Sequence, residues 1–168
     1  IAQKLIKEMD VNLEDVRNKR ANLNPQEIGD DKKRMAQWKR WQRNPVFNEK
    51  EVNKMTAAGL KKLSEMQLTD GGWGWFSGWG ERSYPHTTAV VVHGLIIAKA
   101  NGAKVDAGML DAGVTWLKNY EARETERIRM WEKRKRNTKK YASAMDAFVR
   151  LVLAEAKSNN KEMLGYLF

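Results

Sequence analysis

The sequence contains no cysteine, only three prolines and no apolar run long enough to cross a membrane. The lack of cysteine excludes disulfides, thiolate metal sites and a cysteine nucleophile within this chain. The longest apolar stretch, residues 89–98, is interrupted by His93 and Gly94 and is too short for a transmembrane helix. No segment alternates polar and apolar residues for long, so β-strands are not expected.

Length and composition point to one domain, or to part of one. The chain has 168 residues, of which 42% are hydrophobic and 31% charged, so it can form a core and a solvated surface. Its aromatic and branched apolar content argues against disorder. It begins at Ile1 without an initiator methionine or a signal peptide, and it ends at Phe168 within a predicted helix. We therefore interpret it as a piece of a larger protein.

Positive charge is concentrated in one segment. The formal net charge is +10, and residues 123–140 hold nine Lys or Arg against three Glu, which is a net +6. A run of this kind can face nucleic acid or an acidic membrane, but a solvated helix face is the preferred interpretation. No aromatic interleaving is visible beyond Trp131 and Tyr141, so a nucleic-acid-binding module is a minor alternative. The candidate basic surface consists of Lys133, Arg134, Lys135 and Arg136.

Apolar residues recur at helical spacing along most of the chain. Tyr84-Pro85 and Asp106 are expected before helices, and Asn101-Gly102 after one. Continuation of the helix after Asp106 beyond Tyr120 is left open, because that helix would be unusually long. The predicted helices cover residues 1–9, 12–16, 25–43, 48–67, 85–100, 106–120, 137–156 (starting at Asn137 or Thr138) and 161–168. The predicted fold class is all-α, built of antiparallel helix hairpins, with the helix at 87–100 buried on most sides.

One stretch interrupts the helical pattern. Residues 67–80 hold three tryptophans, one phenylalanine and five glycines. Glycine permits tight turns and tryptophan supplies large apolar rings, so the stretch predicts a tight, aromatic-filled turn. We expect the Gln67 amide to bond free backbone groups at helix ends and Trp73 to pack over the joint. The structural motif comprises Gln67, Asp70, Gly71, Gly72, Trp73, Gly74 and Trp75.

The spacing Gln67-x-x-x-Gly71-x-Trp73 resembles the QW element of the α/α-toroid superfamily. That superfamily includes terpenoid cyclases, protein prenyltransferases and the thioester domains of complement and alpha-2-macroglobulin proteins. Residues 63–76, 85–99 and 113–117 resemble bacterial alpha-2-macroglobulin-like proteins in particular. The resemblance implies a single partial α/α toroid over residues 1–168, with 21–48 as a lineage-specific insertion.

In that family a Cys–Gln thioester acylates an attacking protease, so the resemblance implies part of a covalent protease trap. The implied partners are target proteases and other domains of the parent, and the implied location is extracellular, periplasmic or at the cell envelope. No thioester can form within this cysteine-free chain. Either the Cys–Gln element lies upstream in the parent, or the chain is a paralogue that has lost it. The role of this chain would then be scaffolding. A partial toroid leaves apolar helix faces uncovered, so self-association is expected.

Two histidines are candidates for chemistry. His86 lies near the place where some family members carry a histidine that takes over the thioester acyl group, so it is the candidate thioester-assisting residue. A histidine after Tyr-Pro can equally cap a helix. His93 lies among valines, and we expect a core histidine that bonds a backbone group.

Other chemistries have less support in the sequence. Asp30-Asp31, the only Asp doublet, is interpreted as a helix start, and no phosphate-binding loop is present. We therefore expect no enzyme activity, no cofactor and no metal site. A toroid enzyme or a carbohydrate-binding relative is the alternative. Trp75 and Trp79 could stack on a sugar, although packing between helices is the preferred interpretation for both.

Overall fold

The computed structural model describes residues 49–75, 80–134 and 139–168. Contacts along the chain define two units, residues 1–58 and 59–168, and nearly all of the described structure belongs to the second. Helices make up 71% of the described residues, which contain no strand, so the all-α prediction is confirmed. The helices predicted before residue 48 and the insertion predicted at 21–48 lie outside the described residues.

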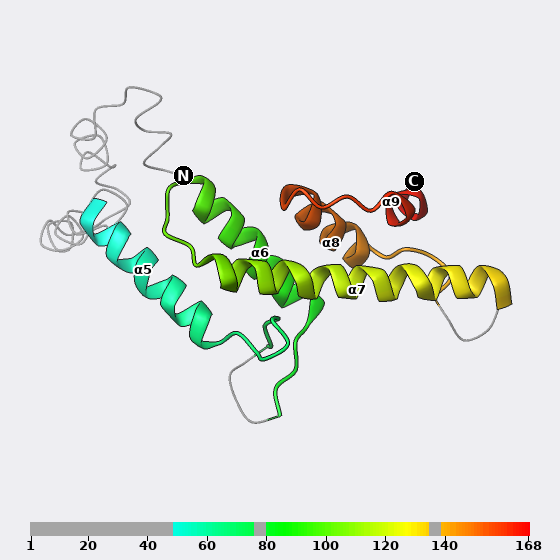
Figure 1. Cartoon of the computed structure of the whole chain (residues 1–168), viewed down its shortest axis with the longest axis horizontal. Helices are drawn as coiled ribbons and strands as arrows, with labels where there is room; N and C mark the ends of the chain where they lie inside the picture. The colour runs from blue at the N-terminus through cyan, green and yellow to red at the C-terminus, as the bar shows by residue number, and fades with distance from the viewer. Residues whose placement is uncertain (1–48, 76–79, 135–138) are drawn as a thin grey trace, which may run out of the picture. The chain divides into compact units, whose positions relative to one another are not determined.

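Five helices are seen in the described part of the chain, and four of them agree with the predicted segments (Figure 1). They are α5 (Glu49–Glu65), α6 (Pro85–Ala100), α7 (Ala107–Arg134), α8 (Ala144–Glu155) and α9 (Lys161–Leu167). Pro85 stands in the first turn of α6, where its missing N–H costs nothing. After α6 the chain turns at Gly102, whose φ of 85° lies in the left-handed region.

The helix that follows Asp106, α7, ends at Arg134. It runs for 28 residues, which corresponds to about 42 Å at the usual rise per residue. It therefore continues well past Tyr120 into the basic segment. The Asp106 side chain accepts a hydrogen bond from the backbone N–H of Met109 (2.6 Å), as a helix cap does.

The predicted start of the helix over residues 137–156 is wrong. The structure begins α8 at Ala144, and residues 139–142 are not helical. Ser143 is the cap: its hydroxyl accepts from the N–H of Asp146, whose carboxylate accepts from the N–H of Ser143. This reciprocal capping box satisfies two backbone donors and stabilises the helix start there.

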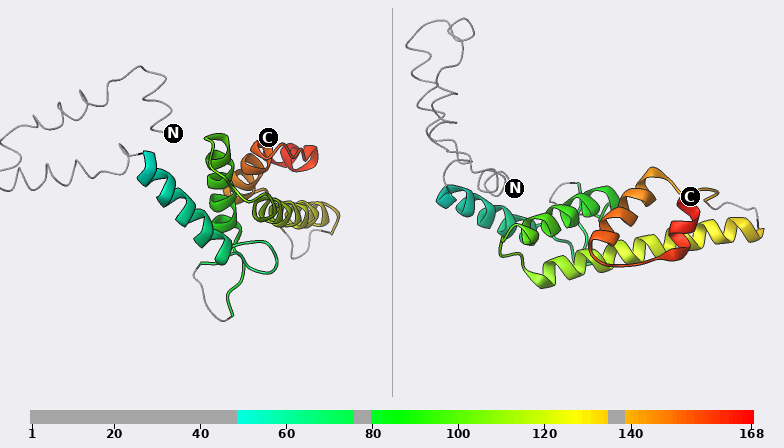
Figure 2. Two further views of the ribbon diagram at one scale, coloured as in Figure 1. Left: turned by 60° about the vertical axis from the view of Figure 1, so that its left-hand side comes forward. Right: turned by 90° about the horizontal axis from the view of Figure 1, so that it is seen from above.

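The core lies where α6, α7 and α8 pack against one another, with α9 against α7 and α8 (Figures 1 and 2). Only one stripe of α6 is buried, and Val90 is 47% exposed, so the prediction that this helix is buried on most sides is wrong for the described structure. None of the described helices combines the length and apolar character that crossing a bilayer requires. The buried apolar core comprises Trp73, Ala89, Val92, Leu95, Met109, Leu110, Trp116, Leu117, Val149, Val152 and Leu153.

Candidate functional site

The glycine- and tryptophan-rich stretch forms a tight corner between α5 and α6. Gln67 and Trp73 face each other in an isolated antiparallel bridge. The N–H of Leu68 donates to the carbonyl of Gly72 and the N–H of Gly71 donates to that of Leu68, both at 2.9 Å. Gly71 has a φ of 89°, a conformation that favours glycine. We call residues 67–75 and 81–84 the corner.

The Gln67 side chain bonds two backbone carbonyls that are far apart in the sequence. Its amide Nε2 donates to the carbonyl of Gly71 and to that of Met109, each at 2.9 Å. The first bond closes the turn, and the second reaches the first turn of α7. The expected bonding of this amide to backbone groups is seen, but its acceptors are not free carbonyls at a helix end: Gly71 lies in the turn and Met109 in the first turn of α7.

Trp73 packs at the centre of the corner with 2% of its surface exposed. Its indole Nε1 donates to the carbonyl of Leu63 in α5 (2.8 Å), and its backbone N–H donates to the hydroxyl of Thr88 in α6 (3.0 Å). A Cβ at Gly113 of α7 would lie 2.8 Å from a ring carbon of Trp73. One residue, through its side chain and its backbone N–H, thus joins the end of α5 to both α6 and α7.

The two remaining motif glycines let the returning chain approach closely. A Cβ at Gly72 would lie 2.4 Å from the hydroxyl oxygen of Ser83, and one at Gly74 would lie 2.2 Å from the Glu81 side chain. The N–H of Tyr84 donates to the carbonyl of Trp73 (2.9 Å). In the corner, residues 72–74 therefore lie directly against residues 81–84.

Asp70 connects the turn to α7. Its carboxylate accepts from the Ser83 hydroxyl (2.6 Å), the Gly72 N–H (3.1 Å) and the Trp116 indole N–H (2.8 Å). Partial burial by itself would raise the pKa of Asp70, but these three donors outweigh that effect and hold the pKa below its usual value. The sequence marked Asp70 as a motif residue but offered no signal for its bond to Trp116.

Trp75 is not packed between helices, so the preferred interpretation of this ring is wrong. Its side chain is 73% exposed, while its backbone N–H donates to the Glu81 carboxylate (2.9 Å). The bond to Glu81 fixes the backbone at this point but leaves the ring in solvent. Trp79 lies outside the described residues.

The two histidines occupy the surface of α6. His86 is exposed, and its ring lies 6.1 Å from that of Phe148 between centroids. The helix cap position is held by Tyr84, and no side-chain cap bond is present, so His86 does not cap α6. The prediction of a core His93 is wrong: its Nδ1 lies 2.6 Å from the Glu155 carboxylate of α8, because His93 stands beside the buried stripe of α6.

The candidate basic surface is described only in part. Lys133 is exposed near the end of α7. The side chain of Arg134 and both Lys135 and Arg136 lie outside the described residues. The structure therefore places one of the four predicted side chains.

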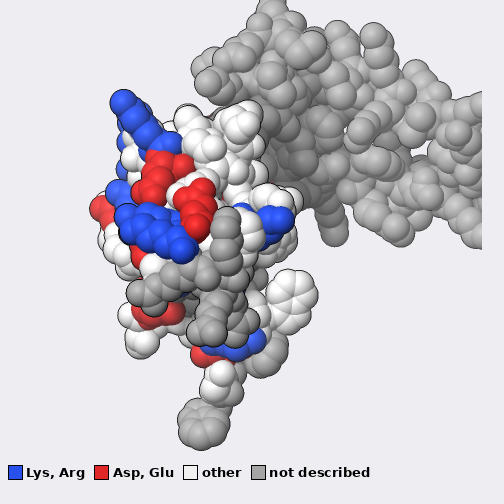
Figure 3. Space-filling model, turned by 90° about the vertical axis from the view of Figure 1, so that its right-hand side faces the viewer, with Lys and Arg blue, Asp and Glu red and all other residues white. Residues whose placement is uncertain are grey.

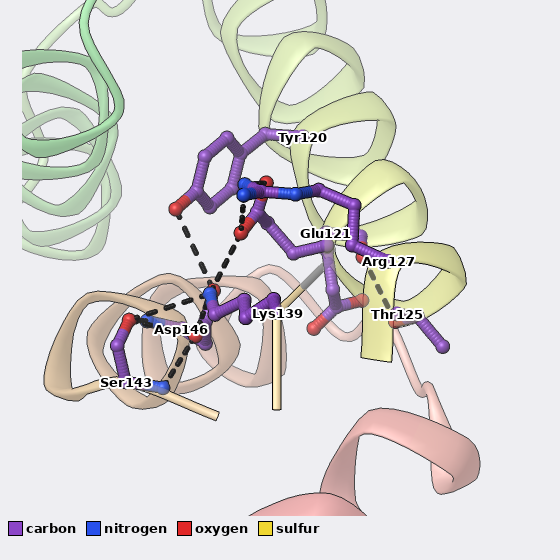
Figure 4. Close-up of polar contacts among 8 residues, drawn as sticks. Tyr120, Glu121, Thr125, Arg127, Lys139, Ser143 and Asp146 are labelled. Carbon is purple, nitrogen blue, oxygen red and sulfur yellow. Dashed lines mark hydrogen bonds and ion pairs between the residues drawn. The ribbon is translucent and has the colours of Figure 1, made fainter. Parts of the chain in front are cut away.

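A buried polar network between α7 and α8 was missed by the sequence reasoning (Figure 4). Lys139 forms ion pairs with Glu124 (2.7 Å) and with Asp146, which is 1% exposed. Burial alone would raise the pKa of Asp146, but bonds from Lys139 and Ser143 hold it below its usual value. Burial together with the negative charges of Asp146 and Glu124 raises the pKa of Tyr120 to about 12.

A second buried ion pair fastens the turn before α9. Arg150 of α8 donates from Nη1 to both oxygens of Glu121 (3.0 and 3.1 Å) and from Nη2 to the carbonyl of Ser158. Asn160 also donates to Glu121 (2.9 Å). The sequence signal was weak: Asp146 and Arg150, four residues apart, lie side by side at one edge of the apolar face of the helix.

The described residues contain no group of three His, Asp or Glu side chains arranged to hold a metal ion. Comparison with known proteins finds no matching family model, no matching curated protein and no matching solved structure. The resemblance to alpha-2-macroglobulin-like proteins therefore depends on the residues of the chain alone. Chemically, the corner is a set of backbone and side-chain hydrogen bonds that surround a buried indole.

Proposed function

We propose that this chain is a scaffolding part of the thioester domain of an alpha-2-macroglobulin-like protease trap. The observation that supports the proposal is the bonding of the Gln67-x-x-x-Gly71-x-Trp73 element. Gln67 reaches α7, Gly71 makes the left-handed turn, and Trp73 joins three helices. Each residue of the motif thus has a separate structural task at a joint between helices.

The proposed role is mechanical. In a covalent trap, the helices around a thioester must keep that bond protected until a protease cuts elsewhere in the molecule. A joint that ties α5, α6 and α7 together suits this task, because breaking its bond between Trp73 and Thr88 would leave a buried backbone N–H unpaired. The fold we propose for the complete domain is an α/α toroid of helix hairpins.

The covalent chemistry would belong to another part of the parent protein, because this chain has no cysteine. His86 remains the candidate for assisting acyl transfer. The residue is exposed and makes no hydrogen bond or ion pair within the described residues. Target proteases and neighbouring domains of the parent are the proposed partners, at the cell envelope or outside it.

The test uses the parent protein. Treatment with a broad-specificity protease is expected to release one titratable thiol and to form a protease adduct that survives boiling in detergent. Prior exposure to methylamine, which opens thioesters, should abolish both. A parent that carries a Cys–Gln element yet releases no thiol and forms no adduct would contradict the proposal.

One observation favours a second candidate, carbohydrate binding. Trp75 is 73% exposed, and its backbone N–H is held by the Glu81 carboxylate, so a sugar ring can stack on an exposed indole whose backbone is fixed. Quenching or shift of tryptophan fluorescence by soluble polysaccharides, lost in Trp75→Ala, is the expected result for this candidate. Unchanged fluorescence at saturating polysaccharide would remove it.

A further inference from the structure

Two aromatic rings that are ten residues apart in the sequence meet at the far end of α7. The ring centroids of Trp131 and Tyr141 lie 6.5 Å apart with an interplanar angle of 37°. The ammonium of Lys140 lies 5.1 Å from the Trp131 centroid and 4.7 Å from that of Tyr141. Cations at these distances are attracted to the ring faces. We call Trp131, Lys133, Lys140 and Tyr141 the basic aromatic tip.

The segment before α8 is held so that these side chains face outward. Lys139 is 14% exposed and pairs with Glu124 and Asp146, which fastens the backbone to α7 and α8. The next residues, Lys140 and Tyr141, are exposed, and Tyr141 is 68% exposed. The buried ion pairs therefore orient an aromatic ring and a cation toward solvent.

The acidic side chains near the tip are already bound within the protein. Glu124 pairs with Lys139, Glu126 with Arg129, and Glu132 accepts from the Tyr166 hydroxyl (3.1 Å). Figure 3 shows Lys and Arg side chains interspersed with Asp and Glu on this side of the molecule.

The cations of the tip have no such partners. Within the described residues, Lys133 and Lys140 pair with no carboxylate. The free charge at the tip is therefore positive.

We propose that the basic aromatic tip binds single-stranded nucleic acid, a function beyond scaffolding. An exposed ring on which a base stacks, here Tyr141, next to cations that meet phosphates is the combination by which proteins hold single strands without sequence preference. An anionic membrane suits the tip less well, because binding at a membrane surface also buries an apolar face, and Tyr141 is the one exposed large apolar side chain among the four residues of the tip.

The test measures fluorescence anisotropy of a labelled oligothymidine of about 12 nucleotides, within the usual range of single-strand sites, with the 168-residue chain. Binding should weaken with salt, and Tyr141→Ala should lower affinity by about tenfold while Tyr141→Phe, which keeps the ring, retains it. Lys140→Ala should weaken binding and flatten the salt dependence. Lys104→Ala, an exposed lysine outside the tip, is the matched control and should bind like the wild type.

Three results would overturn the proposal. The first is no binding at low salt. The second is equal loss of affinity in Lys104→Ala and Lys140→Ala with Tyr141→Ala unchanged, which would mean attraction by net charge alone. The third is binding to phosphatidylserine vesicles, sensitive to Tyr141→Ala, without binding to the oligonucleotide. Far-UV circular dichroism of each variant should match the wild type, because the substituted side chains are exposed.

Discussion

At the scale of the residue, two tryptophans separated by one glycine have opposite environments. Trp73 is 2% exposed and donates its indole N–H to the carbonyl of Leu63, whereas Trp75 is 73% exposed. Both have the same side chain and nearly the same place in the sequence. The difference comes from the turn, which directs one ring between α6 and α7 and leaves the other in solvent.

We expect Trp73→Ala to reduce the free energy of unfolding by about 3–5 kcal/mol, the usual cost of removing a large buried ring. Trp75→Ala is the matched control and should change it by no more than about 0.5 kcal/mol. Urea unfolding followed by far-UV circular dichroism measures both. Similar losses for the two variants would contradict the environments described.

Two helical glycines allow a second comparison. A Cβ at Gly113 would lie 2.7 Å from a methyl of Val92 and 2.8 Å from the Trp73 ring, whereas nothing lies within 4 Å of a Cβ at Gly94. We expect Gly113→Ala to destabilise by about 1–3 kcal/mol through overpacking. Gly94→Ala should stabilise by about 0.5–1 kcal/mol, because alanine is the better helix former. Thermal unfolding should give a lower midpoint for Gly113→Ala and a higher midpoint for Gly94→Ala than for the wild type. Midpoints that shift in the same direction for both variants would refute the packing argument.

At the scale of the element, α7 holds the described fold together by two kinds of contact. Its first half packs Met109, Leu110 and Leu117 into the apolar core and meets the corner. Its second half contacts α8 and the segments beside it through the buried charges of Glu121 and Glu124. Removing one partner of such a buried pair is costly because it leaves a charge unpaired.

The start of α8 offers a test at this scale. Ser143→Ala removes the hydroxyl of the capping box and should cost about 0.5–2 kcal/mol of stability. Ser64→Ala, at an exposed position of α5, is the control and should be nearly neutral. Hydrogen exchange of the first amides of α8 should also accelerate in Ser143→Ala alone. Protection equal to that of the wild type would exclude the capping role.

At the scale of the whole molecule, two carboxylates make folding sensitive to acid. Asp70 in the corner and Asp146 at the start of α8 both have a pKa below the ordinary 3.8 when folded. A lowered pKa means that the folded state holds the proton more weakly than the unfolded state. The stability that each contributes is therefore present above about pH 4 and is lost as the pH falls through the folded pKa.

We expect the urea midpoint of the wild type to fall steeply below about pH 4, and the Asp146→Asn curve to be lower at neutral pH but flatter in acid. Asp70→Asn should also lower the urea midpoint at neutral pH and flatten the curve in acid. The loss at neutral pH should be smaller than for Asp146→Asn, because Asp70 is the less buried of the two. Curves for variant and wild type that run parallel from pH 6 to pH 2 would show that neither carboxylate contributes.

Prediction from the sequence succeeded where the signal is local. The periodicity of apolar residues and the positions of Pro85, Asp106 and Gly102 located α5, α6, α7 and α9. The start of α8 was misplaced because Asn137 and Thr138 offered a cap of their own, and the Ser143–Asp146 box was overlooked. The buried networks were missed because their partners lie far apart: 15 residues for Lys139 and Glu124, and 29 for Arg150 and Glu121.

The sequence by itself determined the all-α class, most helix boundaries and the existence of a tight turn at the Gly-Trp stretch. These features depend on hydrogen bonds and side-chain contacts between residues that are only a few positions apart, so they can be predicted from the local sequence. Only the tertiary structure decided that Trp73 is buried and Trp75 exposed, that His93 pairs with Glu155, and that Trp131 meets Tyr141. Those outcomes depend on which helix faces touch, and that choice is made by packing across the whole domain.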